Sequence, residues 1–184
     1  MSEGIVKFRE FVEALPGDIR EVLALAGDTK LPKPARRWAV AALNYVLLNL
    51  DLVPDWVPVI GLCDDAAVLR VAMAILGDQD VPDMPVERVA TVGRLGNEAD
   101  AVREFLGGDL ADTFRRYVES LAEREVQGRR PDQILRDDKT FGLWKRDVEA
   151  MLKAHRPDLR PMQDPDKISR DLLSYFRAKL GRTV

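Results

Sequence analysis

The sequence predicts an all-α fold of about eight helices. Three observations lead to this fold class. Apolar residues recur at spacings of three and four along most of the chain, prolines and glycines divide these stretches into helix-sized lengths, and no segment alternates apolar and polar residues for long enough to form a strand. The nearest approach to a strand is 57–62, which a proline interrupts. A chain of 184 residues, 46% of them hydrophobic, can bury a core without disulfides.

Two helices are expected in the first 27 residues. The first should end at Pro16-Gly17, because a proline inside a helix removes a backbone hydrogen-bond donor and clashes with the preceding turn. Asp18 is then expected to cap a second helix, which Gly27 closes. The apolar positions of the two helices are Ile5, Phe8, Phe11, Val12, Leu15, Ile19, Val22, Leu23 and Ala26.

The next two helices are expected to form a central apolar hairpin. One covers 35–50 and is apolar on nearly every face, which is typical of a helix in the middle of a core. The other begins at Asp64 or Asp65, either of which can cap it, and ends near Gly77. The connector between them cannot be helical, because it is rich in proline. Its helix-breaking residues are Pro54, Pro58 and Gly61.

A change in composition divides the chain after a predicted linker at 78–85. Residues 1–85 hold eight Lys/Arg against thirteen Asp/Glu, whereas 86–184 hold twenty against eighteen and have narrower apolar stripes. We therefore expect a helical core over 1–85 and an amphipathic helical region over 86–184, and the packing of the two into one domain stays open. The second region should hold one helix from Val86, one capped by Asp109, one that ends at Pro157 and one from Pro165 to Gly181.

The connector of the hairpin is the most informative segment for function. Four carboxylates lie within fifteen residues of each other, beside the two most apolar helices: Asp51, Asp55, Asp64 and Asp65. A carboxylate beside a core is costly unless it finds a hydrogen-bond donor, a cation or water. The sequence therefore places its candidate site here.

This acidic connector resembles the YkvA-like family of bacterial helical domains of unknown function. The residues that carry the resemblance are Asp51-Leu52-Val53-Pro54-Asp55-Trp56-Val57-Pro58-Val59-Ile60-Gly61 and Asp64-Asp65, with Leu31-Pro32, Arg37 and Tyr45 upstream. The resemblance covers about residues 28–70, and the chain has Asn49 where many members have a proline. It implies a helical architecture and a candidate site but no reaction, and it implies a membrane link for some relatives.

Three interpretations of the four carboxylates stay open. In the first they are structural: Asp64 or Asp65 caps its helix, and Asp51 and Asp55 fix the turn through backbone amides or ion pairs. The arginines available for such pairs are Arg36, Arg37 and Arg70. In the second interpretation the four carboxylates hold Mg²⁺, Mn²⁺ or Ca²⁺, since these hard cations take oxygen ligands. Such an ion could activate water or clamp a phosphate.

In the third interpretation the hairpin contacts a membrane. Trp38, Tyr45 and Trp56 are amphipathic aromatic residues of the kind found at membrane interfaces, and two arginines lie at the mouth of the hairpin. Bare carboxylates at the inner end of the hairpin would be expensive there. Neither apolar stretch of the hairpin reaches the length of a standard transmembrane helix.

Charge and composition disfavour several classes of function. A net charge of −3 disfavours nucleic acid as a partner. One cysteine leaves no internal disulfide, and one histidine leaves little for a zinc site or a catalytic dyad. Cys63 is expected to be a small buried hydrophobe and His155 to lie in the last turn of a helix. The N-terminal residues begin an amphipathic pattern without a secretory signal, so a cytoplasmic location is expected.

Together these observations predict a helical interaction or regulatory module without catalysis, whose partner is another protein or a second copy of the chain. One alternative is a divalent-metal-dependent hydrolase of phosphate esters, with Asp51, Asp55, Asp64 and Asp65 as metal ligands. The other is a membrane-associated helical hairpin protein with peripheral membrane contact. No cofactor is expected apart from such a cation.

Overall fold

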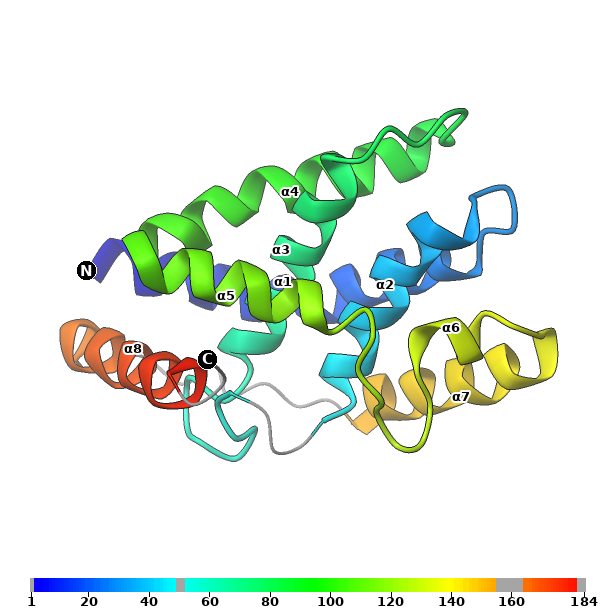
Figure 1. Ribbon diagram of the computed structural model, residues 1–184. Coiled ribbons are helices and arrows are strands. Elements are labelled where there is room, and N and C mark those ends of the chain that lie inside the picture. The colour runs from blue at the N-terminus through cyan, green and yellow to red at the C-terminus, as the bar shows by residue number, and fades with distance from the viewer. Residues whose placement is uncertain (1, 49–51, 155–163, 182–184) are drawn as a thin grey trace.

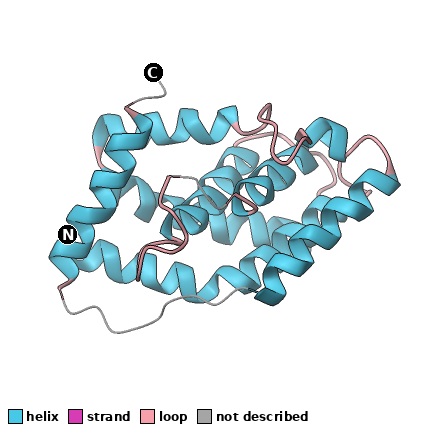
Figure 2. Cartoon of the chain, turned by 90° about the horizontal axis from the view of Figure 1, so that it is seen from below, coloured by secondary structure: helices cyan, strands magenta, loops and turns pink. Residues whose placement is uncertain are grey.

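The computed structural model describes residues 2–48, 52–154 and 164–181. These residues form eight helices and no strand, so the predicted all-α fold is confirmed (Figures 1 and 2). The helices are α1 (Ser2–Gly27), α2 (Lys33–Val46), α3 (Cys63–Gly77), α4 (Val86–Leu106), α5 (Gly108–Ser120), α6 (Pro131–Ile134), α7 (Asp138–Ala154) and α8 (Pro165–Leu180).

The first helix differs from the prediction, because α1 is continuous through Pro16. The apolar stripe keeps its phase across the proline, and Leu15 and Ile19 on either side of it are fully buried. Burial of that stripe offsets the cost of a proline in a helix interior, about 3 kcal/mol from a lost backbone hydrogen bond and the clash of the ring with the preceding turn. The carbonyl of Pro16 accepts a hydrogen bond of 3.0 Å from the Arg20 guanidinium. Asp18 is therefore an interior residue of α1, and its predicted role as a helix cap is wrong.

The predicted central hairpin is formed by α2 and α3. Helix α2 ends at Val46, with Leu47 as its C-cap, a few residues before the predicted end at 50; Asn49 lies outside the described residues. Helix α3 begins and ends within two residues of its predicted limits and is buried along nearly its whole length. It lies in the middle of the molecule and contacts α1, α2, α4 and α5 (Figure 1).

The helices after the linker at 78–85 cover this hairpin. Helix α4 crosses α3 closely at Gly96, where a Cβ atom would lie 3.3 Å from the Cα of Ala74. Helix α5 begins at Gly108 and has Gly107 as its N-cap, with a φ of 70° that favours glycine. The predicted cap Asp109 is wrong, since this residue lies inside the first turn, where its charge suits the helix dipole.

Helices α7 and α8 complete the fold. Helix α8 runs from Pro165 to a C-cap at Gly181, as predicted, and contacts α1 and α5. The short α6 was not predicted, and the predicted end of α7 at Pro157 lies outside the described residues, as does His155. The described residues nevertheless form the expected eight helices. Two predicted helices are joined in α1, which removes one, and the unpredicted α6 adds one.

Candidate functional site

A hydrogen bond between Tyr45 and Asp64 organises the acidic connector. The hydroxyl of Tyr45 donates to Oδ2 of Asp64 at 2.5 Å, and the same oxygen accepts the backbone N–H of Val53 at 2.9 Å. The N–H of Leu52 in turn donates to the Tyr45 hydroxyl at 3.1 Å. Both side chains are fully buried. One carboxylate and one phenol therefore fix the connector between the end of α2 and the start of α3.

Asp64 and Asp65 do not cap α3, so that part of the structural interpretation is wrong. The N-cap residue is Leu62, which makes no side-chain cap hydrogen bond, and the two aspartates lie in the first turn of the helix. The acidic pair still suits the positive end of the helix dipole. Asp64 binds Tyr45 of α2 and the backbone of the connector, which a local sequence pattern does not reveal.

The remainder of the connector is a set of tight turns closed by backbone hydrogen bonds. The N–H of Val57 donates to the carbonyl of Pro54 at 2.8 Å, and the N–H of Gly61 donates to the carbonyl of Val57 at 3.0 Å. A Cβ atom on Gly61 would lie 2.4 Å from the carbonyl oxygen of Asp55. Glycine is therefore required here by close backbone approach and not by an unusual φ.

Burial changes the proton affinity of the groups in the connector. It raises the pKa of Asp64 to about 7, against the lowering effect of the hydrogen bonds from Tyr45 and Val53, and the charge of Asp55 adds to the rise. Burial also raises the pKa of the Asp55 carboxyl. Cys63 is buried, as predicted, and its burial beside two carboxylates raises the pKa of its thiol, so it is not a reactive thiolate.

The structure brings three of the four candidate metal ligands into one region, while Asp51 lies outside the described residues. Asp64 and Asp65 are buried and Asp55 is half-buried. In the described part of the chain, Oδ1 of Asp55 and Oδ1 of Asp64 are buried and make no hydrogen bond. Among the described residues no group of three or more His, Cys, Asp and Glu side chains has a geometry that could hold a metal ion.

The arginines available to pair with the connector have other partners among the described residues, so this alternative is wrong for Asp55, while Asp51 lies outside the described residues. Arg36 donates to the carbonyl of Ala26 at 2.7 Å, and Arg37 pairs with Glu123. Arg70 turns toward α1 and α4, so none of these three arginines is seen paired with a described carboxylate of the connector.

Arg70 is the centre of a buried ion cluster that the sequence analysis missed. Its Nη2 lies 3.0 Å from Asp18 and 2.8 Å from Glu98, and its guanidinium stacks over the Phe11 ring at 3.8 Å from the centroid. Arg94 also pairs with Asp18, at 2.8 Å. The signal available in the sequence was a single arginine inside an otherwise apolar helix, since such a charge needs acidic partners from neighbouring helices.

The aromatic residues of the membrane interpretation are in different environments. Tyr45 is fully buried, so its predicted role at a membrane interface is wrong. Trp38 is half-buried against the core, whereas Trp56 on the connector is 66% exposed. Over the part of the chain that the structure describes, none of the helices combines the length and the apolar character needed to cross a bilayer.

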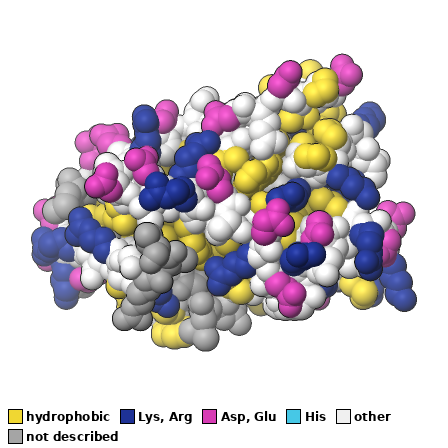
Figure 3. All heavy atoms as spheres, viewed as in Figure 1, with side chains coloured by type: hydrophobic (Ala, Val, Ile, Leu, Met, Phe, Trp, Pro, Cys, Tyr) yellow, Lys and Arg dark blue, Asp and Glu magenta, His cyan; other side chains and the backbone are white. Residues whose placement is uncertain are grey.

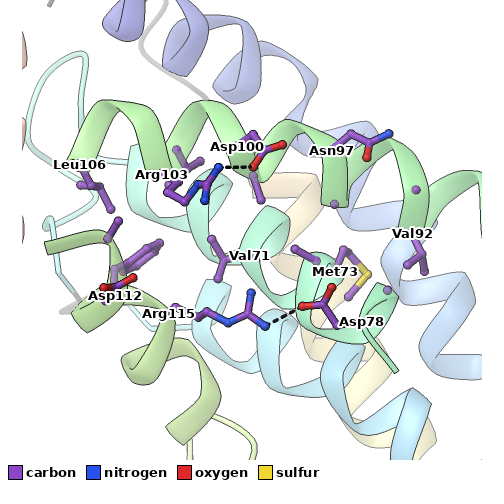
Figure 4. A pocket seen from close by; sticks show the side chains of 18 residues that line it. Val71, Met73, Asp78, Val92, Asn97, Asp100, Arg103, Leu106, Asp112 and Arg115 are labelled. Atoms are coloured by element: carbon purple, nitrogen blue, oxygen red, sulfur yellow. Dashed lines mark hydrogen bonds and ion pairs between the residues drawn. The ribbon is translucent and has the colours of Figure 1, made fainter. Parts of the chain in front are cut away.

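A pocket of about 450 Å³ lies between α3, α4 and α5 (Figure 4). Its floor is apolar and its rim is charged. The floor side chains include Val71, Met73, Val92, Val102, Leu106 and Phe114. At the rim Arg115 pairs with Asp78 at 2.7 Å, and Arg103 pairs with Asp100 at 3.3 Å. Asp112 also lies at this rim (Figure 4). The sequence analysis missed this pocket, because it depends on how three helices cross.

Comparison with known proteins supports the resemblance over a short segment. Residues 35–70 match the family model described as a protein of unknown function (DUF1232), the family to which YkvA-like proteins belong. The match covers α2 from its first turn, the connector and the first half of α3, which includes Tyr45, Asp64 and Arg70. No curated protein and no solved structure gives a significant match to the chain. The chain is thus similar to this family over 36 of its 184 residues.

Proposed function

We propose that the chain is a non-catalytic helical interaction module that binds its protein partner at the pocket between α3, α4 and α5. The observation that carries this proposal is the pocket itself: an apolar floor at the centre of the fold, open at the surface and surrounded by charged residues. An apolar centre with a polar rim is the usual anatomy of a protein-binding surface.

The rest of the hairpin acts as the rigid support of this surface. Helix α3 supplies part of the floor with Val71 and Met73, and its opposite end is held by Asp64 and Tyr45. The Arg70 cluster fixes α3 to α1 and α4 from within the core. A binding surface placed on helices held in this way is pre-organised, which reduces the entropy lost on binding.

A display library of helical peptides, selected on the full chain, tests this proposal. Gly93 lines the pocket, and a Cβ atom placed on it meets no atom within 4 Å, so Gly93→Trp should fill the pocket and leave α4 intact. Gly17→Trp is the matched control, because Gly17 is an exposed helical glycine of α1 with the same free space. Peptides that bind the wild type and the Gly17→Trp variant equally, and lose about tenfold or more in affinity on Gly93→Trp, support the proposal. Selected peptides that bind the Gly93→Trp variant as tightly as the wild type contradict the proposal.

A second candidate function is the divalent-metal-dependent hydrolase of phosphate esters. The observation that favours it is the pair of buried oxygens without hydrogen bonds, Oδ1 of Asp55 and Oδ1 of Asp64, on two carboxylates close enough that one raises the pKa of the other. With Asp51 and Asp65 these residues would offer oxygen ligands to Mg²⁺, Mn²⁺ or Ca²⁺.

Thermal unfolding in EDTA and in each of the three metal ions tests this candidate. A filled site raises the melting temperature by several degrees, because an ion that binds only the folded state stabilises it. Asp55→Asn should abolish that rise, while Asp112→Asn, at the exposed rim of the distant pocket, should leave it unchanged. The candidate fails if the wild type melts at the same temperature with and without metal.

Peripheral membrane contact is favoured by one observation, the 66% exposure of Trp56 on the connector. Large exposed tryptophans are typical of surfaces that enter the interfacial layer of a bilayer. Flotation with anionic liposomes tests this, with Trp56→Ala as the variant that should no longer float. A wild-type chain that stays at the bottom of the gradient contradicts it.

A further inference from the structure

An exposed apolar stripe on α4 extends the pocket into a longer groove. Val86 and Val89 are 82% and 51% exposed, and Gly93, which follows Val89 by one turn, lies both on this stripe and in the pocket lining. Beyond Gly93 the same face of α4 continues through Asn97 to Asp100 at the pocket rim, so the exposed apolar side chains of the stripe are the two valines beside the pocket. Figure 3 shows apolar side chains exposed toward the upper right, where α4 begins, with carboxylates beside them. We call the stripe and the pocket together the α4 groove.

The border of the α4 groove is acidic. Residues 78–100 contain six Asp/Glu and two Lys/Arg, and at the pocket end the border also holds Asp112 together with Arg103 and Arg115, which are paired with Asp100 and Asp78. Arg88 and Arg94 have partners on other segments: Arg88 pairs with Asp28, directly after the end of α1, and Arg94 pairs with Asp18 of α1. The groove therefore keeps exposed carboxylates beside its valines: Asp80, Asp83 and Glu87. Its chemistry fits a helix with an apolar centre and basic flanks.

Helix α7 of the same chain has such a face on its outer side. Leu143 is 44% exposed, and Lys139 and Arg146 lie one turn before and one turn after it, both exposed. The face continues to Lys153, about 21 Å along the helix from Lys139. The opposite side of α7 is the one that packs in the core, with Trp144 and Val148 buried. Figure 1 places α4 at the top of the molecule and α7 at the bottom, so the two faces do not meet within one copy.

We propose that a second copy of this chain inserts the outer face of its α7 into the α4 groove. Leu143 of that copy enters the pocket, and Lys139 and Arg146 meet the acidic border of the groove. The occupant is assigned by charge complementarity, and the assignment rests on the proposed interaction function. Since the two surfaces are different, the contact is head-to-tail and leaves a free groove and a free α7 at the ends of every assembly that does not close into a ring.

Sedimentation velocity of the full chain tests the association directly. We expect the average mass to rise with protein concentration between about 1 and about 200 μM, as for a micromolar interface. We also expect the apparent Kd to weaken by about tenfold between 0.05 and 0.5 M NaCl, because the contact joins opposite charges at an exposed surface. A chain that is monomeric at every concentration overturns the inference.

Two variants identify the surfaces involved. Leu143→Asp removes the α7 face and keeps the groove, whereas Gly93→Trp blocks the groove and keeps α7; each should be monomeric alone. Mixed in equal amounts they should form a dimer that grows no further, since one intact groove then meets one intact α7 face. Gly17→Trp should associate like the wild type. Circular dichroism checks that every variant is folded.

The outcomes separate this inference from the proposed function. If the selected peptides lose affinity on Gly93→Trp and the chain itself stays monomeric, the groove binds another protein's helix, and only the inference of a second copy is overturned. If the chain associates but the two variants fail to complement each other in the mixture, the contact is not head-to-tail, which also overturns the inference. If Gly93→Trp alters neither peptide binding nor association, the inference and the proposed function are both wrong.

Discussion

The hydroxyl of Tyr45 and the carboxylate of Asp64 form a 2.5 Å hydrogen bond in a fully buried position, across 19 residues of sequence. This bond joins the last turn of α2 to the first turn of α3, and its two groups also hold the backbone N–H groups of Leu52 and Val53. The shape of the connector therefore depends on a phenol in one helix and an acid in the next.

Tyr45→Phe should destabilise the fold by about 1–3 kcal/mol, because it removes one of the two hydrogen bonds to the buried Oδ2 of Asp64 and leaves the buried N–H of Leu52 without a partner. Urea denaturation measures this change in the free energy of unfolding. The control is Tyr117→Phe, whose hydroxyl accepts from Arg124 at an exposed position; it should cost less than about 0.5 kcal/mol. Equal losses of unfolding free energy in the two variants would show that the buried hydrogen bond stabilises the fold no more than the exposed one does.

Stability should fall as the pH rises from 4 toward 7. The folded pKa of Asp64 is about 7, above the ordinary value of about 3.9 for an unfolded aspartate. A raised pKa means that the folded state holds the proton of Asp64 more tightly than the unfolded state does. The contribution of this group to the free energy of unfolding is therefore fully present below pH 4 and is lost as the pH rises through 7. Asp64→Asn keeps the shape and removes the titration, so its free energy of unfolding should vary less with pH over this range. A wild-type profile that rises between pH 4 and 7 would contradict this.

Arg70→Met should destabilise the protein by about 3–5 kcal/mol, because it removes the buried cation that Asp18 and Glu98 share and leaves only the partly exposed Arg94 paired with them. Adding Asp18→Asn to this variant should recover part of the loss, since much of the cost is a buried carboxylate that has lost its buried partner. Arg103→Met, which breaks the exposed pair with Asp100, should cost no more than about 0.5 kcal/mol. Chemical denaturation compares the three variants. A loss after Arg70→Met as small as that of Arg103→Met would show that the cluster is not the anchor of α3.

Two glycine substitutions should have opposite effects. Gly61→Ala places a Cβ atom against the backbone of Asp55 and should cost about 1–3 kcal/mol through overpacking. Gly93→Ala meets no neighbour and should stabilise α4 by about 0.5–1 kcal/mol through helix propensity. The melting temperatures of both variants show whether each substitution stabilises or destabilises the protein. The interpretation of the connector as a tight backbone contact fails if Gly61→Ala melts like the wild type.

Local patterns predicted most of the helices, because spacing and helix-breaking residues act within one or two turns. The start of α8 at Pro165 and the extent of α3 followed from such signals. The prediction failed at Pro16, where burial of the surrounding stripe in the assembled core outweighs a local cost. It also failed at Asp109, because Gly107, a glycine with positive φ two residues earlier, is the N-cap of α5.

The sequence predicted where the candidate site lies, but it did not predict which residues contact one another there. The sequence indicated that carboxylates lie beside the most apolar helices, and Asp64 and Asp65 are indeed buried there. It could not assign partners, because Tyr45 reaches Asp64 and Asp18 reaches Arg70 only after the helices pack. The proposed metal ligands remain a prediction, since Asp51 is outside the described residues.

The hydrogen bond from Trp144 Nε1 to the Asn44 side-chain oxygen, 2.8 Å long and buried, joins positions 100 residues apart. Asn44 belongs to the segment that matches the family model, and so does Arg70, yet Trp144, Asp18 and Glu98 all lie outside that segment. A peptide cut to the matched segment would therefore carry an orphaned carboxamide and an uncompensated guanidinium. The recognisable portion of this chain is not self-sufficient, and its flanks are an integral part of what makes it fold.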